Sequence, residues 1–427
     1  MKNTVFMNAR LIDPEKGETN KGWLLLRNGK IADTGTGNPP TVDTAHLVNC
    51  EGHCLAPGII DIGVKVCEPG ERHKESYQSA GLAAVAGGIT TMAIRPDTLP
   101  AIDTPETLEF VMRRASEASL TNVLPMAALT KGREGKEMTE VKLLMDVGAS
   151  AFTDCDHVVA NPRVLLRALA YAKSCESLVI GHPQESVFSS GTAATSGKFA
   201  SLKGLPSVST IAERIGLERD LALVEHTGAK YHVDQLTTHN ALPALRRAKE
   251  NGSDITAGVS IHHLTLNELD VADYRTFFKV KPPLRSESDR IAVVNALRDG
   301  LIDIISSMHT PQDEESKRLP FAEAASGAVA LETLLPAVLR LYHSSALDLP
   351  CLFKALSHNP ANRLGLNAGC LRRGMDGDLI LFDPDYPFIL DRQTLISKCK
   401  NTPFDGEKLQ GKVLGTWIAG KRKFPLN

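Results

Sequence analysis

The chain has 427 residues and a formal net charge of −2, with 42% hydrophobic and 23% charged residues, which is the composition of a folded globular protein. This balance provides no basic surface for nucleic acid or an anionic membrane, so we expect neither as a partner. No apolar stretch reaches the roughly 18 residues that a membrane span needs, and no secretory signal is evident. We therefore expect a cytoplasmic protein.

Both ends of the chain contain short strand patterns. In residues 1–55 the run 5–13 is apolar and is followed by a second run with an Asn-Gly turn signal. Residues 366–427 repeat this texture, for example at 413–422. Neither end could bury a sheet face alone. We therefore expect both termini to form one small composite β-sandwich domain.

Residues 56–365 alternate strand-like runs with amphipathic helical patterns. Helical patterns fall at 104–118, 163–174 and 289–299, and the strand candidates are 90–94, 122–127, 149–152, 177–180, 230–233, 255–259 and 302–306. Repeated β-then-α units predict an α/β fold, a (β/α)8 TIM barrel, with an open doubly wound sheet as the alternative. In such a barrel, chemistry is found at the C-terminal ends of the strands.

Several phrases in order along the chain carry a family resemblance. Segment 57–70 reads Pro-Gly-Ile-Ile-Asp-Ile-Gly-Val-Lys-Val-Cys-Glu-Pro-Gly and resembles the strand-end signature of dihydroorotases, which belong to the cyclic amidohydrolases. Further segments that resemble this family are 86–91, 130–137, 278–285 and 401–404. The resemblance implies a barrel of the metal-dependent hydrolase type and a place in pyrimidine biosynthesis.

The first strand end departs from the family pattern. The resemblance implies two histidine metal ligands and an arginine for the substrate carboxylate, but these positions hold Gly63, Lys65 and Cys67. The substrate-binding asparagine is replaced by Asp97, whose charge would repel an anionic substrate. We therefore expect both metal binding and substrate binding to be impaired here.

The later strand ends keep part of the site. By resemblance, Asp154 matches the metal-bridging aspartate and His182 matches a metal ligand. Gln235 replaces another histidine ligand, and an amide is a poor zinc ligand. Met308 occupies the position of the catalytic aspartate and has no proton to exchange, although His309 beside it remains. Gln312 stands where the family has a further histidine.

The remaining polar residues allow alternatives. Asp154 and His182 could form a hydrogen-bonded pair, which we favour, or hold one metal with help from His309 or His232. Lys65 could imitate a carbamylated bridging lysine, but we expect its ammonium to pair with Asp154. We read the eight scattered cysteines as reduced thiols, so a redox role for Cys67 beside Cys155 is not favoured.

These departures favour a catalytically inactive dihydroorotase-like protein. By family resemblance alone, such chains assemble with aspartate transcarbamoylase, and we expect a homo-oligomer, dimeric or higher, without a cofactor. The alternative is a divergent active dihydroorotase, or related cyclic amidohydrolase, with a non-standard or single-metal zinc site, formed for example by Asp154, His182 and His309. A third hypothesis is a binding protein that keeps a pyrimidine or hydantoin pocket without chemistry.

Overall fold

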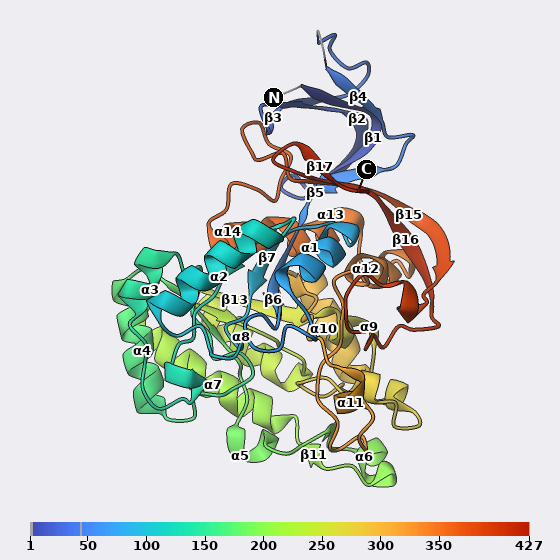
Figure 1. The fold of residues 1–427 in the computed structure, drawn as a ribbon. Helices are drawn as coiled ribbons and strands as arrows, with labels where there is room; N and C mark the ends of the chain where they lie inside the picture. The colour runs from blue at the N-terminus through green and yellow to red at the C-terminus, as the bar shows by residue number, and fades with distance from the viewer. Residues whose placement is uncertain (1–2, 43–44, 427) are drawn as a thin grey trace.

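A sheet domain combines strands from both ends of the chain. The computed structural model describes residues 3–42 and 45–426. The strands of this domain pair in the order β17-β16-β15-β5-β1-β2-β3, with β4 beside β1, and blue and red ribbons accordingly lie together at the top of Figure 1. The strands are β1 (Thr4–Asp13), β2 (Glu18–Arg27), β3 (Lys30–Gly35), β4 (His46–Asn49), β5 (Cys54–Pro57), β15 (Leu379–Ile389), β16 (Lys408–Ile418) and β17 (Lys421–Phe424).

The two chain ends meet through apolar side chains. Phe6 on β1 contacts Trp417 on β16 edge to face, with ring centroids 4.9 Å apart. Leu24, Leu26 and Leu379 are buried in the same cluster. Because each terminal segment supplies only part of this core, the sheet forms from both ends together.

The residues between β5 and β15 in the sequence form the barrel. Its strands are parallel and pair in the orders β6-β7-β8 and β14-β13-β12-β9. Phe152 bridges the two groups by pairing with Ala127 and with Val179. The barrel closes between β14 and β6, where the amide of Ser307, directly after β14, donates a 2.8 Å hydrogen bond to Asp61 on β6. The strands are β6 (Ile59–Val64), β7 (Ile89–Ile94), β8 (Asn122–Pro125), β9 (Leu178–Gly181), β12 (Lys230–Val233), β13 (Ile255–Ser260) and β14 (Ile304–Ser306).

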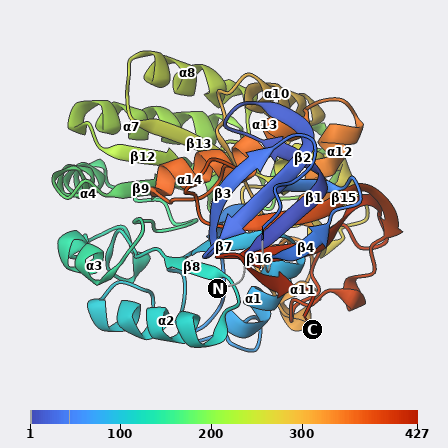
Figure 2. The ribbon, with the colours of Figure 1, turned by 90° about the horizontal axis from the view of Figure 1, so that it is seen from above.

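Helices surround the barrel (Figure 2). In α2, Thr104 caps the N-terminus by accepting a hydrogen bond from the Thr107 amide, and Leu108, Val111 and Ala115 lie on the buried face. The main helices are α1 (Tyr77–Ala86), α2 (Pro105–Ala118), α3 (Val141–Val147), α4 (Pro162–Ser174), α7 (Ile211–Thr227), α8 (Leu242–Glu250), α10 (Glu287–Arg298), α12 (Leu334–His343), α13 (Leu349–Phe353) and α14 (Asn359–Leu364).

Short elements collect at the C-terminal ends of the barrel strands. Figure 1 shows several of them at the end of the barrel away from the sheet domain. One short π-helical turn, η5 (Lys354–His358), lies at the opposite end, where the Ser357 hydroxyl donates a hydrogen bond to the Pro57 carbonyl oxygen just before β6. The elements at the C-terminal ends are α5 (Ser186–Ser189), β10 (Ala194–Thr195), α6 (Lys198–Lys203), β11 (Ser207–Val208), α9 (Ile261–Thr265) and α11 (Glu314–Lys317), with short helical turns η1 (Lys131–Arg133), η2 (His239–Ala241), η3 (Glu268–Val271), η4 (Thr276–Phe278) and η6 (Arg392–Thr394). The strand ends beneath these elements form the barrel mouth.

The observed architecture confirms the (β/α)8 barrel with a sheet domain built from both termini. The predicted strand at 149–152 is reduced to the bridges of Phe152. Within the described ranges, every helix is too short or too polar to cross a membrane.

Candidate functional site: the barrel mouth

Gly63 and Met308 share one small space at the mouth. Gly63 lies near the end of β6, where the pairing register with β7 shifts, and its backbone is left-handed with φ +100°. A Cβ atom at this position would lie 2.8 Å from the Sδ atom of Met308. Such an approach is shorter than a van der Waals contact. The Met308 thioether therefore occupies the space that a side chain at position 63 would need.

Lys65 pairs with two carboxylates, one from the loop after β6 and one from the loop after β7. Its ammonium lies 3.2 Å from Asp97 and 3.8 Å from Glu71. Burial alone would lower the pKa of Lys65, but the nearby carboxylate of Asp97 outweighs it and raises the pKa. The predicted pair with Asp154 is wrong, because these two contacts are the ion pairs that Lys65 makes within the described residues.

Asp97 belongs to a network of fixed charges. Arg95 directly follows β7, and its guanidinium donates a 2.9 Å hydrogen bond to the Asp97 carboxylate. Arg95 also lies 3.6 Å from Asp156, and Arg133 lies 3.9 Å from each carboxylate. Asp97 is only 7% exposed. The neighbouring cations therefore neutralise the Asp97 carboxylate, so it is not a free negative charge at the barrel mouth.

Asp156 extends this network to the far side of the mouth. Lys281 donates to its carboxylate at 3.1 Å. Burial would raise the pKa of Asp156, but Arg95 and Lys281 outweigh burial and hold the pKa well below its ordinary value. We call the set Lys65, Arg95, Asp97, Arg133, Asp156 and Lys281 the mouth network. Positive charge at this mouth is therefore supplied by side chains of the protein.

The two retained residues at the metal positions do not pair with each other. Asp154 accepts hydrogen bonds from the Thr130 amide at 2.9 Å and from the Thr130 hydroxyl, and burial raises its pKa despite these bonds. His182 lies with its Nδ1 atom 3.9 Å from Asp234, and neither ring nitrogen has a hydrogen-bond partner among the residues that the structure describes. The favoured hydrogen-bonded Asp154–His182 pair is thus wrong. Both side chains do line one small cavity of about 20 Å³, which holds roughly one water molecule.

The other candidate ligands each interact with a different partner rather than with one another. His309 accepts a hydrogen bond from the Ala330 amide at Nδ1, and its Nε2 atom lies 3.6 Å from Glu75. His232 binds the Thr256 hydroxyl through Nδ1, and burial lowers its pKa to about 3. The Gln235 amide donates to the Lys281 carbonyl oxygen at 3.2 Å.

The donors present therefore do not fit the metal centre that the resemblance implies. Across residues 3–42 and 45–426, no three His, Cys, Asp or Glu side chains converge in a way that could hold a metal ion. The proposed set Asp154, His182 and His309 is among those that do not converge. A protonated lysine at position 65 adds a charge that repels a divalent cation.

Two cysteines in this region are buried and protonated. Cys67 and Cys155 are 1% and 4% exposed, and burial raises the pKa of each thiol far above its ordinary value. A thiol with a raised pKa is a weak nucleophile. Both residues have a positive φ, 65° and 57°, as does Met308 at 47°. Backbone strain thus accumulates at the same strand ends where the side chains depart from the family pattern.

Sequence reasoning missed the arginines of the mouth network. Arg95 and Arg133 were not singled out, although Arg95 follows a predicted strand and stands two residues before an aspartate. An unpaired strand-end carboxylate calls for a cation close by. The need for such a cation could have identified Arg95 from the sequence. Arg133 reaches the site from η1, and no feature of the sequence pointed to it.

Solved structures share this fold along the whole chain. An L-hydantoinase (dihydropyrimidinase) from Arthrobacter aurescens superposes with a TM-score of 0.88 at 22% identity, covering 99% of this chain and 96% of that protein. A dihydropyrimidinase from Brevibacillus agri NCHU1002 superposes with a TM-score of 0.84 at 18% identity, covering 98% and 94%. These likenesses define the class of fold, that of the cyclic amidohydrolase barrels.

Relatives by sequence narrow the class further. A family model described as dihydro-orotase-like matches residues 52–241. A dihydroorotase from Anaplasma phagocytophilum (strain HZ) is 38% identical over 421 residues, covering 97% of this chain and 94% of that protein. A dihydroorotase-like protein from Pseudomonas putida is 37% identical over 414 residues, covering 97% of each. The chain belongs to the dihydroorotase-like family.

Proposed function

We propose that this chain is a non-catalytic member of the dihydroorotase-like family that acts as a structural or regulatory partner of aspartate transcarbamoylase. The observation that carries the proposal is the mouth network: Lys65 and Arg95 occupy, with their carboxylate partners, the strand ends where metal ligands would converge. Fixed ammonium and guanidinium groups at these strand ends repel a divalent metal ion.

The chemistry of amide hydrolysis gives the physical reason. Hydrolysis of a cyclic amide near neutral pH requires an activated water, commonly one whose pKa is lowered by metal. It also requires a group that carries a proton to the leaving nitrogen. Met308 stands at the position of that group, and a thioether can neither accept nor donate this proton. The position of the catalytic aspartate therefore supplies no proton carrier, which supports the proposal.

The partner rests on resemblance to the inactive dihydroorotase-like chains that assemble with aspartate transcarbamoylase. The test is to mix the purified chain with the transcarbamoylase of the same organism and to measure complex formation by size-exclusion chromatography with light scattering. We expect a stable complex and a transcarbamoylase that is more active or more stable than the enzyme alone. The control replaces this chain by a catalytically active dihydroorotase. Separate elution at micromolar concentrations would contradict the proposal.

The second candidate is an active cyclic amidohydrolase. The specific observation in its favour is that a relative named dihydroorotase is 38% identical over nearly the full chain. It would require Asp154 and His182 to move onto a zinc ion together with His309 or His232. Its test is hydrolysis of dihydroorotate by the purified chain with added zinc, beside a chain in which Asp154 and His182 are both replaced by alanine. Turnover by the wild-type chain that the double variant lacks would establish this candidate and overturn the first.

A further inference from the structure

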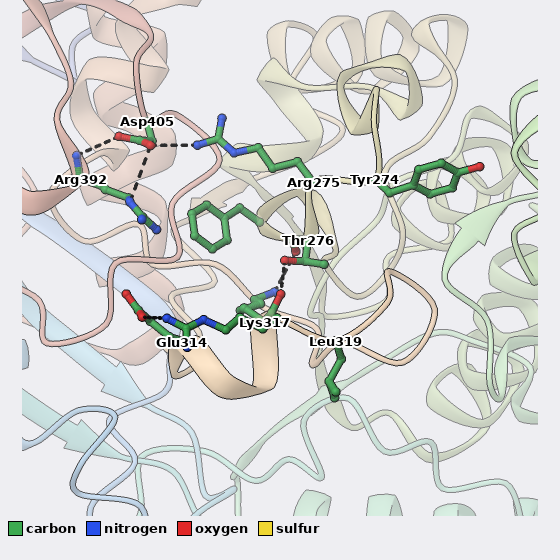
Figure 3. Close-up of a pocket in the computed structure, with 10 residues that line it drawn as sticks. Tyr274, Arg275, Thr276, Glu314, Lys317, Leu319, Arg392 and Asp405 are labelled. Atoms are coloured by element: carbon green, nitrogen blue, oxygen red, sulfur yellow. Dashed lines mark hydrogen bonds and ion pairs between the residues drawn. The ribbon is translucent and has the colours of Figure 1, made fainter.

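A second cavity lies outside the barrel mouth. It has a volume of about 590 Å³ and is bordered by η4, α11 and η6, together with Asp405. Figure 3 shows its side chains converging from these separate segments. None of the strand-end positions discussed above lines it. The volume is that of a site for a small organic molecule.

The lining of this cavity is rich in cations. Four basic side chains border it, which are Arg275, Lys317, Arg318 and Arg392, against the two acidic ones of Glu314 and Asp405. This surplus of positive charge suits a phosphate monoester, whose charge at neutral pH is about −1.5 to −2.

Two of the guanidinium groups are held in place before any ligand binds. Arg275 and Arg392 lie over the Phe277 ring, 5.3 and 5.1 Å from its centroid. Both also contact the Asp405 carboxylate, Arg275 at 3.0 Å and Arg392 at 3.8 Å. Figure 3 shows Asp405 lying between the two arginines. Because these side chains are already ordered, binding an anion costs little additional entropy.

A buried ammonium beside the cavity has no carboxylate partner among the described residues. Lys317 is 4% exposed and donates hydrogen bonds to the carbonyl oxygens of Thr276 at 3.0 Å and Ala325 at 2.6 Å. Burial and the nearby Lys279 ammonium lower the pKa of Lys317 to about 7. An anion in the cavity would supply the negative charge that this environment lacks. Binding would then favour the protonated lysine.

We propose that this cavity is a binding site for a small phosphate monoester, in which Arg275 and Arg318 face the phosphate group and the buried Lys317 ammonium, whose hydrogen bonds go to the carbonyl oxygens of Thr276, Lys279 and Ala325, acts through its charge. Tyr274 and Leu319, which also line the cavity and are 43% and 47% exposed, provide apolar surface for the organic part of the ligand. The site goes beyond the proposed function, because it requires neither the transcarbamoylase nor any chemistry at the barrel mouth.

The test is isothermal titration of the full chain with three probes at constant ionic strength: inorganic phosphate, ribose 5-phosphate and a nucleoside 5′-monophosphate. We expect saturable binding of phosphate and tighter binding of at least one ester. Arg318→Gln removes a guanidinium that is 74% exposed and whose ion pair within the described residues is with Glu314, so the variant should fold normally. It should weaken phosphate binding about 10-fold, the effect of one charge-assisted hydrogen bond. The matched control is Arg167→Gln, an exposed arginine on α4 outside the cavity.

A pH series with sulfate tests the role of Lys317, since sulfate keeps its charge from pH 7 to 9. The charged groups near Lys317 are Lys279, the pocket residues and, around an adjacent cavity that Lys317 also lines, His73, Asp313, Lys398 and Lys400. The buried His262 has a pKa of about 4 and stays neutral in this range. We expect sulfate affinity to fall as the pH rises from 7 to 9 in the wild type, and Lys317→Met to bind weakly with no such fall.

Three results would overturn the proposal. The first is phosphate binding no stronger than that of chloride. The second is equal affinity in the Arg318→Gln and Arg167→Gln variants. The third is sulfate affinity with the same pH dependence in the wild type and in Lys317→Met.

Discussion

Replacing Gly63 by alanine tests whether the mouth still has room for a side chain at the lost ligand position. The φ of +100° makes any L-residue strained here, at a cost of about 1–2 kcal/mol. The added Cβ atom would also lie 2.8 Å from the Met308 sulfur, and overpacking of this kind costs about 1–3 kcal/mol. We therefore expect Gly63→Ala to lower the free energy of unfolding by about 2–5 kcal/mol.

The matched control is Gly17→Ala. Gly17 also has a positive φ, +70°, but a Cβ atom there would meet nothing within 4 Å. Its cost should be the backbone term alone, about 1–2 kcal/mol. Urea denaturation followed by circular dichroism measures both variants. Adding Met308→Ala to each should show a coupling of about 1 kcal/mol with position 63 and none with position 17. Equal stability of the two glycine variants, with no coupling, would refute the reasoning.

Two further substitutions probe the buried charges. Asp97→Asn removes the carboxylate shared by Lys65 and Arg95, and urea denaturation should show a loss of about 3 kcal/mol that Lys65→Met partly restores. A loss below about 1 kcal/mol would contradict the role of the network, because that is the value of a surface pair. The folded-state pKa of Lys317, about 7, lies below its ordinary value of 10.5, so the unfolded chain binds more protons between these values. The stability of the wild type relative to Lys317→Met should therefore rise from pH 7 to 9, by at most about 1.4 kcal/mol per pH unit. A stability difference that does not change with pH would contradict the lowered pKa of Lys317.

Much of the fold could be predicted from the sequence because strand patterns and family phrases fall in order. The predicted strand 230–233 matches β12, and 255–259 matches β13 to within one residue. The segment 149–152 was expected to be a full strand but contributes only the bridges of Phe152. A short apolar run does not by itself determine how many residues enter the ladder.

The site could be predicted from the sequence only where the chemistry of a single side chain determines whether it can bind a metal or transfer a proton. The sequence alone shows that Gly63 has no donor atom and that Met308 has no exchangeable proton. Which carboxylate pairs with Lys65 depends on the direction of strand ends in three dimensions, and the pair predicted with Asp154 was wrong for this reason. Arg133, which reaches the network from η1, could not be assigned a partner from spacing at all.

The most direct test of the central claim is the metal content of the purified chain. The protein would be incubated with excess zinc, dialysed, and analysed by inductively coupled plasma mass spectrometry, with a catalytically active dihydroorotase treated in parallel. The mouth network predicts far less than one zinc ion per chain, while the active enzyme retains its metal. Retention of roughly one or two zinc ions per chain, lost when Asp154 and His182 are replaced by alanine, would contradict the account.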